Sequence, residues 1–196
     1  ESGAFAGFGR GPIDRELDRA SQRPGEGVLE KAVSGVYMGP LTLRLLKALA
    51  GERAFSERGR RRLESISDLS TIEIDRLCAG HVDDANVLCD PAFSDGDHAV
   101  MREVFGAVVE RAALLTAVNI AAVVVKGGAG KDPAHPVCVN IDGSTYYKTL
   151  GMAQKVQARL QAILEARGLH IRCVHVDEAP LIGAAMAAIA TFGPGH

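Results

Sequence analysis

Apolar residues recur at helical spacing over two long stretches of the chain. Residues 28–50 predict a largely helical segment, bent where Ser34 and Gly35 interrupt it. Asp97 is the expected cap of a second, longer helix that runs through the apolar segment 121–125 and ends at glycine. The apolar positions that define the two faces are Leu41, Leu45, Leu46 and Leu49, then Val100, Val104, Val108, Leu115 and Val118.

The last third of the chain changes its period twice. Residues 137–141 alternate between apolar and more polar side chains, which predicts a β-strand. Residues 152–164 carry one apolar helical face, and residues 170–176 are short and rich in β-formers. Pro180 suits the first position of a final helix that ends near Gly193. This order of strand, helix, strand and helix predicts a layered α/β domain.

The first part of the chain gives weaker signals. Residues 3–12 are rich in glycine and are interpreted as a strand that enters a loop. Residues 14–20 and 72–78 predict short helices. Residues 51–62 are rich in arginine, so we expect them to be exposed.

Composition indicates an ordinary globular protein. The chain has 196 residues, of which 47% are hydrophobic and 23% charged, enough for one domain with its own core. The net charge of -2 predicts neither nucleic acid nor an anionic membrane as a partner. The longest apolar run, 112–125, is shorter than the roughly 20 residues that span a bilayer. The four cysteines form no C-x-x-C pair, which favours a reduced, cytoplasmic setting.

Two glycine-containing segments are candidates for a nucleotide site. The strand that ends at Ile141 enters the turn Asp142-Gly143-Ser144, whose N–H groups and hydroxyl can face a phosphate. Small residues around Gly183 open the last helix, so a nucleotide or another helix can pack closely there. Taken alone, the first segment is equally an ordinary turn, and the second is equally tight packing.

Two carboxylates beside glycine are candidates for a sugar site. Glu1 precedes Gly3, and Glu30 follows Gly27. Sugar hydroxyls donate hydrogen bonds to such carboxylates, and charge-assisted hydrogen bonds are the strong ones. Taken alone, Glu30 is equally a solvated charge on a helix.

Other patterns do not predict a site. The loop 126–132 lacks both the leading glycine and the Ser or Thr of a phosphate-binding loop. His170 and His175 face unlike directions in the expected strand. Scattered residues with partly zinc-like spacing favour structural roles, so no metal site is predicted; they are Cys78, His81, Cys89 and His98.

The motifs together resemble the hexokinase family in their order and spacing, over nearly the whole chain. They are Glu1-x-Gly3-Ala4-Phe5, Asp14-x-x-x-Asp18-x-x-Ser21, Pro24-Gly25, Glu30-Lys31-x-x-Ser34-Gly35-x-Tyr37-Met38-Gly39 and Asp142-Gly143-Ser144-x-Tyr146. The resemblance implies the large lobe of a hexokinase fold, which is an RNase H-like, actin-like ATPase fold of the α/β class. It implies a single domain over residues 1–196 that phosphorylates a hexose, with glucose as the expected one, using ATP and Mg²⁺.

The resemblance also assigns roles to residues. Glu1 and Glu30 correspond to the glutamates that bind the hexose. The positions that correspond to the nucleotide site are Gly35, Gly39, Ser70, Asp142, Gly143, Ser144 and Gly183. Two positions depart from the family pattern, since Gly27 stands where glutamine is frequent and Val36 where lysine or methionine is frequent.

The family's first half has no counterpart in this sequence. Its phosphate loop and catalytic aspartate are absent, so we assign no catalytic residue to the chain and expect the chain alone to be inactive. The missing N-terminal lobe is an expected partner, and the face it leaves open predicts self-association. Two alternatives remain: a non-catalytic sugar- or nucleotide-binding regulator on the same fold, and an interaction module without a small ligand.

Overall fold

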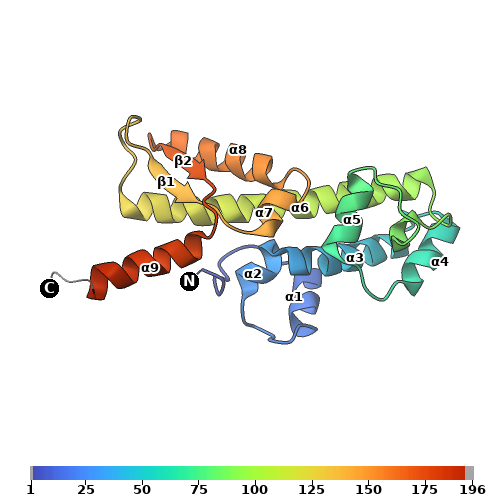
Figure 1. The fold of residues 1–196 in the computed structure, drawn as a ribbon. Coiled ribbons are helices and arrows are strands. Elements are labelled where there is room, and N and C mark those ends of the chain that lie inside the picture. Colours follow the sequence, from blue (N-terminus) through green and yellow to red (C-terminus); the bar gives the residue numbers. More distant parts are fainter. Residues whose placement is uncertain (1, 193–196) are drawn as a thin grey trace.

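The computed structural model describes residues 2–192, which form a mostly helical molecule with a small sheet at one end (Figure 1). Its helices and strands are α1 (Pro12–Arg19), α2 (Val28–Val33), α3 (Gly35–Gly51), α4 (Glu57–Ser65), α5 (Thr71–Cys78), the short 3-10 helix η1 (Val87–Cys89), α6 (Asp95–Gly127), β1 (Val137–Asn140), α7 (Ser144–Lys148), α8 (Met152–Glu165), β2 (Ile171–Val174) and α9 (Ala179–Phe192). The break between α2 and α3 falls at Ser34, where the bend was predicted.

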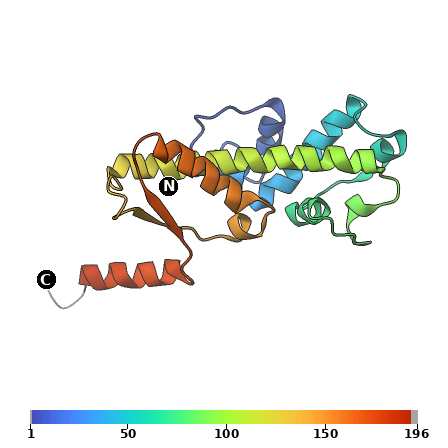
Figure 2. The same cartoon turned by 90° about the horizontal axis from the view of Figure 1, so that it is seen from above.

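The long helix α6 runs the length of the molecule and is its central element (Figures 1 and 2). It packs against α2, α3 and α5 as well as α8. The segment 121–125 continues this helix, which confirms its assignment as helix rather than strand. By length and composition alone α6 is able to cross a membrane, although 39% of its most apolar stretch is buried inside the described structure, against other helices.

The start of α6 corrects one expectation. Ser94 is the N-cap, because its hydroxyl oxygen accepts a hydrogen bond from the Asp97 N–H at 3.2 Å. The Asp97 carboxylate accepts in return from the Ser94 N–H at 2.8 Å. Asp97 is therefore the third residue of the helix, not its cap. The two residues form a capping box, in which the acidic partner lies one turn inside.

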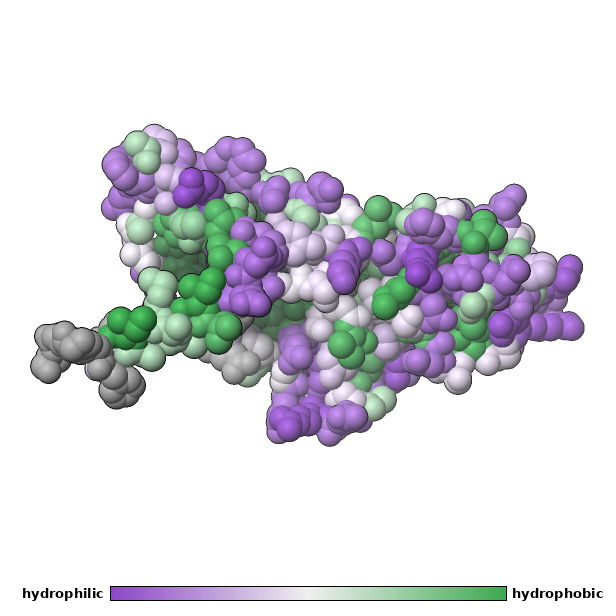
Figure 3. Space-filling model, viewed as in Figure 1, coloured by the Kyte–Doolittle hydropathy of each residue, from purple (hydrophilic) through white to green (hydrophobic). Residues whose placement is uncertain are grey.

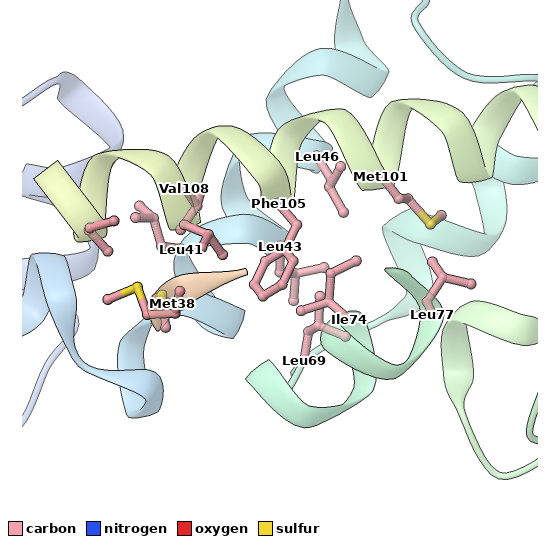
Figure 4. Close-up of a cluster of buried hydrophobic side chains, with 14 of the residues drawn as sticks. Met38, Leu41, Leu43, Leu46, Leu69, Ile74, Leu77, Met101, Phe105 and Val108 are labelled. Atoms are coloured by element: carbon pink, nitrogen blue, oxygen red, sulfur yellow. The ribbon is translucent and has the colours of Figure 1, made fainter. Parts of the chain in front are cut away.

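The buried face of α6 matches the predicted one only in part: Val108 is buried as predicted, whereas Met101 and Phe105 were not in the predicted set. Met101, Phe105 and Val108 point into the core toward α3 and α5 (Figure 4). Val118, by contrast, is 47% exposed. The prediction followed the valines and leucines, but close helix contacts on several sides of α6 bury small residues instead. These are Ala112, Ala113, Ala117 and Ala121.

The two strands form a parallel pair in which Val137 is opposite Ile171 and Asn140 is opposite Val174. α7 and α8 connect them. The predicted alternation in β1 is confirmed, since Val137 and Val139 are half-buried while the residues between and after them are exposed. The partly buried side chains of the sheet, Val137, Val139, Ile171 and Cys173, pack against the core cluster that also contains buried residues of α6 and α8.

Two expectations for the N-terminal part are wrong. Residues 3–11 form turns and irregular backbone rather than a strand, Pro12 begins α1, and the Gly3 carbonyl accepts from the Leu29 N–H at 2.9 Å, at the start of α2. Residues 51–62 are not uniformly exposed, because Phe55 and Gly59 are buried. The cause is Asp97, which accepts hydrogen bonds from the Ser56 N–H and hydroxyl, both at 2.7 Å, and so pulls this segment onto α6.

The last helix, α9, begins at Ala179 and lies apart from the other helices (Figure 1). Its side chains are mostly small or apolar, and they give this end of the molecule a hydrophobic surface (Figure 3). The large apolar side chains exposed on α9 are Leu181, Ile182, Met186 and Ile189.

Candidate functional site

An open groove of about 800 Å³ lies where the start of α3, the start of α5 and the helix α7 meet. These elements come from three distant parts of the sequence. The groove is lined by Ser34, Gly35, Val36, Pro40, Asp68, Leu69, Ser70, Thr71, Ile72, Ser144, Thr145, Lys148 and Thr149. Hydroxyl groups and one lysine thus surround a partly apolar floor, which suits a ligand with both a flat apolar part and a phosphate.

Hydrogen bonds to Gly35 hold the three elements together. The Thr71 hydroxyl donates to the Gly35 carbonyl at 2.5 Å and accepts from the Gly39 N–H at 2.6 Å. From the other side, the Gly35 N–H donates to the Thr145 hydroxyl oxygen at 3.2 Å. The first turn of α3 is therefore fixed to both α5 and α7.

The absence of side chains at Gly35 and Gly39 makes this arrangement possible. A Cβ atom at Gly39 would lie 2.5 Å from the carbonyl carbon of Ser70, in the backbone that begins α5. A Cβ atom at Gly35 would lie 2.8 Å from the Thr145 hydroxyl oxygen. Both distances are shorter than any normal contact, so these glycines let α5 and α7 approach α3.

Ser70 forms one rim of the groove as the N-cap of α5. Its hydroxyl accepts from the Glu73 N–H at 3.2 Å and donates to the Glu73 carboxylate at 2.6 Å. One turn further, Asp75 accepts from the Leu150 N–H at 2.8 Å, which ties α5 to the segment after α7. Burial raises the pKa of Asp75, although that hydrogen bond partly opposes the effect.

The predicted turn before α7 forms the opposite rim. Gly143 has a positive φ of 133°, which favours glycine, and Ser144 is the first residue of α7. Ser144 lines the groove, and Asp142 and Gly143 are exposed immediately before it. Lys148 closes this side one turn later.

A second hollow, of about 680 Å³, lies on the other side of the start of α3. Glu30 lines it with an exposed carboxylate, and Tyr37 contributes from α3. Most of the remaining wall is the loop between α1 and α2, with Gln22, Arg23, Gly25, Glu26 and Gly27. The two hollows share no lining residue, but each takes one from the first turn of α3, Val36 in the first and Tyr37 in the second.

The sequence model of the hexokinase family matches residues 1–190. The chain belongs to the hexokinase family. Hexokinase-1 of Rattus norvegicus is 33% identical over 159 residues, which cover 74% of this chain and 17% of that protein. Hexokinase-9 of Oryza sativa subsp. japonica is 29% identical over 198 residues, which cover 94% of this chain and 39% of that protein. The chain thus spans well under half the length of these relatives.

Solved hexokinase structures show the same fold. One hexokinase crystal structure aligns with a TM-score of 0.73 and 22% identity over 91% of this chain and 40% of the other. The hexokinase from Schistosoma mansoni complexed with glucose aligns with a TM-score of 0.66 and 22% identity, over 85% of this chain and 38% of the other. The predicted fold class, the large-lobe part of the actin-like hexokinase fold, is confirmed.

The hexokinase motif residues fall into three groups in the structure. Gly35, Ser70 and Ser144 line the groove, and Glu30 lines the adjoining hollow. Gly39 is buried beneath the groove, in the contact between α3 and α5. Gly183 lies on the separate helix α9, where an added Cβ would meet no atom of the described residues within 4 Å. Glu1 lies outside the described residues.

Sequence reasoning missed Thr71, Thr145 and Lys148, which also belong to the hexokinase groove. Thr71 directly follows the N-cap Ser70, and the other two follow the Asp-Gly-Ser turn by one helical turn or less, so proximity to the motifs was a usable signal. Within residues 2–192, no group of three or more His, Cys, Asp or Glu side chains is placed to hold a metal ion.

Proposed function

We propose that this chain supplies part of the hexose site and the adenosine side of the ATP site of a sugar kinase. The observation that carries the proposal is that both hollows take lining residues from the first turn of α3. Phosphoryl transfer needs the acceptor hydroxyl and the nucleotide held side by side, so that the reaction proceeds within one complex. Family membership supports sugar phosphorylation as the general chemistry.

Glu30 is the proposed hexose ligand in the second hollow. Its carboxylate is exposed, and no described salt bridge engages it, so it can accept hydrogen bonds from two sugar hydroxyls. Glu1 is the second proposed hexose ligand, on the strength of the family motif. The relative solved with glucose favours glucose as the first hexose to test.

The groove suits a nucleotide through its hydroxyls, its apolar side chains and Lys148. Ile72, which is 67% exposed, offers apolar contact to a base, whereas Ser144 and Lys148 are suited to hydrogen bonds with ribose or phosphate oxygens. The family implies ATP with Mg²⁺, and we assign no residue of this chain to the metal. The phosphate loop and the catalytic base are proposed to come from the remainder of the kinase.

Calorimetric titration of the chain with glucose and with a non-hydrolysable ATP analogue tests these assignments. Glu30→Gln keeps the shape of the side chain but removes the charge, so we expect glucose affinity to fall about tenfold or more. Glu26→Gln is the matched control, because Glu26 lines the same hollow but belongs to no motif. Equal losses in both variants would reject Glu30 as a specific ligand. Absence of glucose-dependent ATP consumption by the longer natural polypeptide would reject the kinase reaction.

A non-catalytic sugar- or nucleotide-binding role on the same fold is the second candidate. Val36 favours it, since this apolar side chain is 74% exposed on the rim of the groove, where the family frequently has a lysine or methionine. Glucose or nucleotide binding without turnover in the longer polypeptide would support this role over the kinase.

A further inference from the structure

A nearly buried ion pair lies in the wall of the proposed hexose hollow, which Lys31 lines together with Glu30. The Lys31 ammonium is 2.5 Å from a carboxylate oxygen of Asp18. The exposed fractions of the two side chains are only 8% and 16%. Lys31 is the neighbour of Glu30 in α2, and Asp18 is near the end of α1, so the pair joins the helices on either side of the loop 20–27.

The ion pair also binds the backbone of that loop at two points. The Lys31 ammonium donates to the Arg23 carbonyl at 2.6 Å. The Gly25 N–H donates to both carboxylate oxygens of Asp18 at 3.1 Å. The hydrogen bond from Lys31 holds the pKa of Asp18 below its ordinary value, so this carboxylate is ionised at neutral pH.

The hydrogen bonds of Asp18 and Lys31 indicate that this ion pair holds the loop 20–27 in place. A buried ion pair alone gives little net stability, because removing both charges from water costs about as much as their attraction returns. Here the remaining hydrogen bonds of both charges go to one loop, which has few buried side chains of its own. That loop supplies much of the wall of the hollow that Glu30 lines.

We propose that Asp18 and Lys31 are positioning residues for hexose binding. Together they fix the loop 20–27 in the conformation that closes the hollow around a sugar held by Glu30. The loop ends at Gly27, the left-handed N-cap of α2 with φ 57°, so its placement also determines where the helix that carries Glu30 begins. The inference rests on the proposed function, since it assumes that a hexose occupies this hollow.

Lys31→Met tests the role by removing the charge at similar side-chain volume. We expect the Gly25 amide to exchange with solvent at least about tenfold faster, and the glucose affinity of the chain to fall about tenfold. Lys31→Arg retains a donor for both Asp18 and the Arg23 carbonyl, so most of the affinity should return. If Lys31→Met does not fold, Asp18→Asn gives the same test, because it removes the charge but keeps an acceptor for the Gly25 N–H.

Arg111→Met is the matched control for a purely structural effect. Arg111 forms a comparable ion pair with Asp14 at 2.7 Å, but neither residue lines the hollow. This variant should lower stability and leave glucose affinity unchanged. The proposal is overturned if Lys31→Met loosens the loop without weakening glucose binding, if Gly25 exchange is unchanged, or if Arg111→Met weakens binding equally.

Failure of the broader function gives a different result. If the wild-type chain and the longer polypeptide bind no hexose, the hexose site itself is rejected, and the positioning role falls with it. If the wild type binds glucose and Lys31→Met binds it with the same affinity, the positioning role alone is rejected.

Discussion

Gly39→Ala is the sharpest test of how the groove is built. The new Cβ would lie 2.5 Å from the Ser70 carbonyl carbon. It would lie slightly closer still to the Leu69 carbonyl oxygen and the Thr71 backbone nitrogen. Backbone atoms cannot rotate away as a side-chain end can. α5 must therefore move off α3, which also weakens the hydrogen bond from the Gly39 N–H to Thr71.

Two opposing effects determine how much Gly39→Ala changes the free energy of unfolding. Alanine is favoured over glycine inside a helix by about 1 kcal/mol. Overpacking costs typically about 1–3 kcal/mol, and rigid backbone neighbours place this site at or beyond the upper limit. We therefore expect a net loss of about 2 kcal/mol, which lowers the Tm of a chain of this size by about 4–8 °C.

Gly106→Ala supplies the control for helix propensity. Gly106 lies within α6, is exposed, and has no described atom within 4 Å of an added Cβ. This variant should raise the Tm by about 2–4 °C, because only the propensity gain applies. Thermal unfolding followed by circular dichroism measures both variants. A Gly39→Ala chain that unfolds at or above the wild-type temperature would refute the close contact between α3 and α5.

Two further variants test the hydrogen bonds around the groove and at the start of α6. Thr71→Val leaves the Gly35 carbonyl and the Gly39 N–H without their partner, so urea denaturation should show a loss of about 1–3 kcal/mol, whereas Thr71→Ser should stay near wild type. Asp97→Asn addresses pH. Burial alone would raise the pKa of Asp97, but hydrogen bonds from Ser56 and Ser94 hold it below the ordinary 3.8. The ionised Asp97 carboxylate therefore stabilises the fold fully above pH 3.8, and this stabilisation is lost as the pH falls through the pKa of the folded state. The difference in the free energy of unfolding between the wild type and Asp97→Asn should accordingly shrink below about pH 4. A stability difference that is constant between pH 6 and pH 3 would contradict this assignment.

Sequence periodicity predicted the helices well where a single face is buried. The break at Ser34 and the continuation of α6 through residues 121–125 were both predicted correctly. Periodicity failed for the burial of α6, since this helix is covered on several sides and alanines pack as closely as valines there. It failed for residues 3–12 because a strand needs a partner strand, which a local pattern does not reveal.

The groove itself was only partly predictable. Motifs identified Gly35, Ser70 and Ser144 as site residues, and the structure brings these three together. The hydrogen bond between Gly35 and Thr145 joins residues 110 positions apart, and nothing local in the sequence indicates such a pairing. Threonine by itself marks no motif in a sequence. The hydrogen bonds made by the threonine hydroxyls are therefore visible only in the folded structure.

Close helix packing is a second physical reason why the motif positions 35 and 39 are glycines. Resemblance to the family assigns Gly35 and Gly39 to the nucleotide, and the structure adds that Gly39 is buried and is not among the residues that line the groove. Both residues allow the backbones of α5 and α7 to reach the first turn of α3. Because Ser70 and Ser144 begin those two helices, the width of the groove depends on these close contacts. A side chain at Gly39 would thus alter the groove from below.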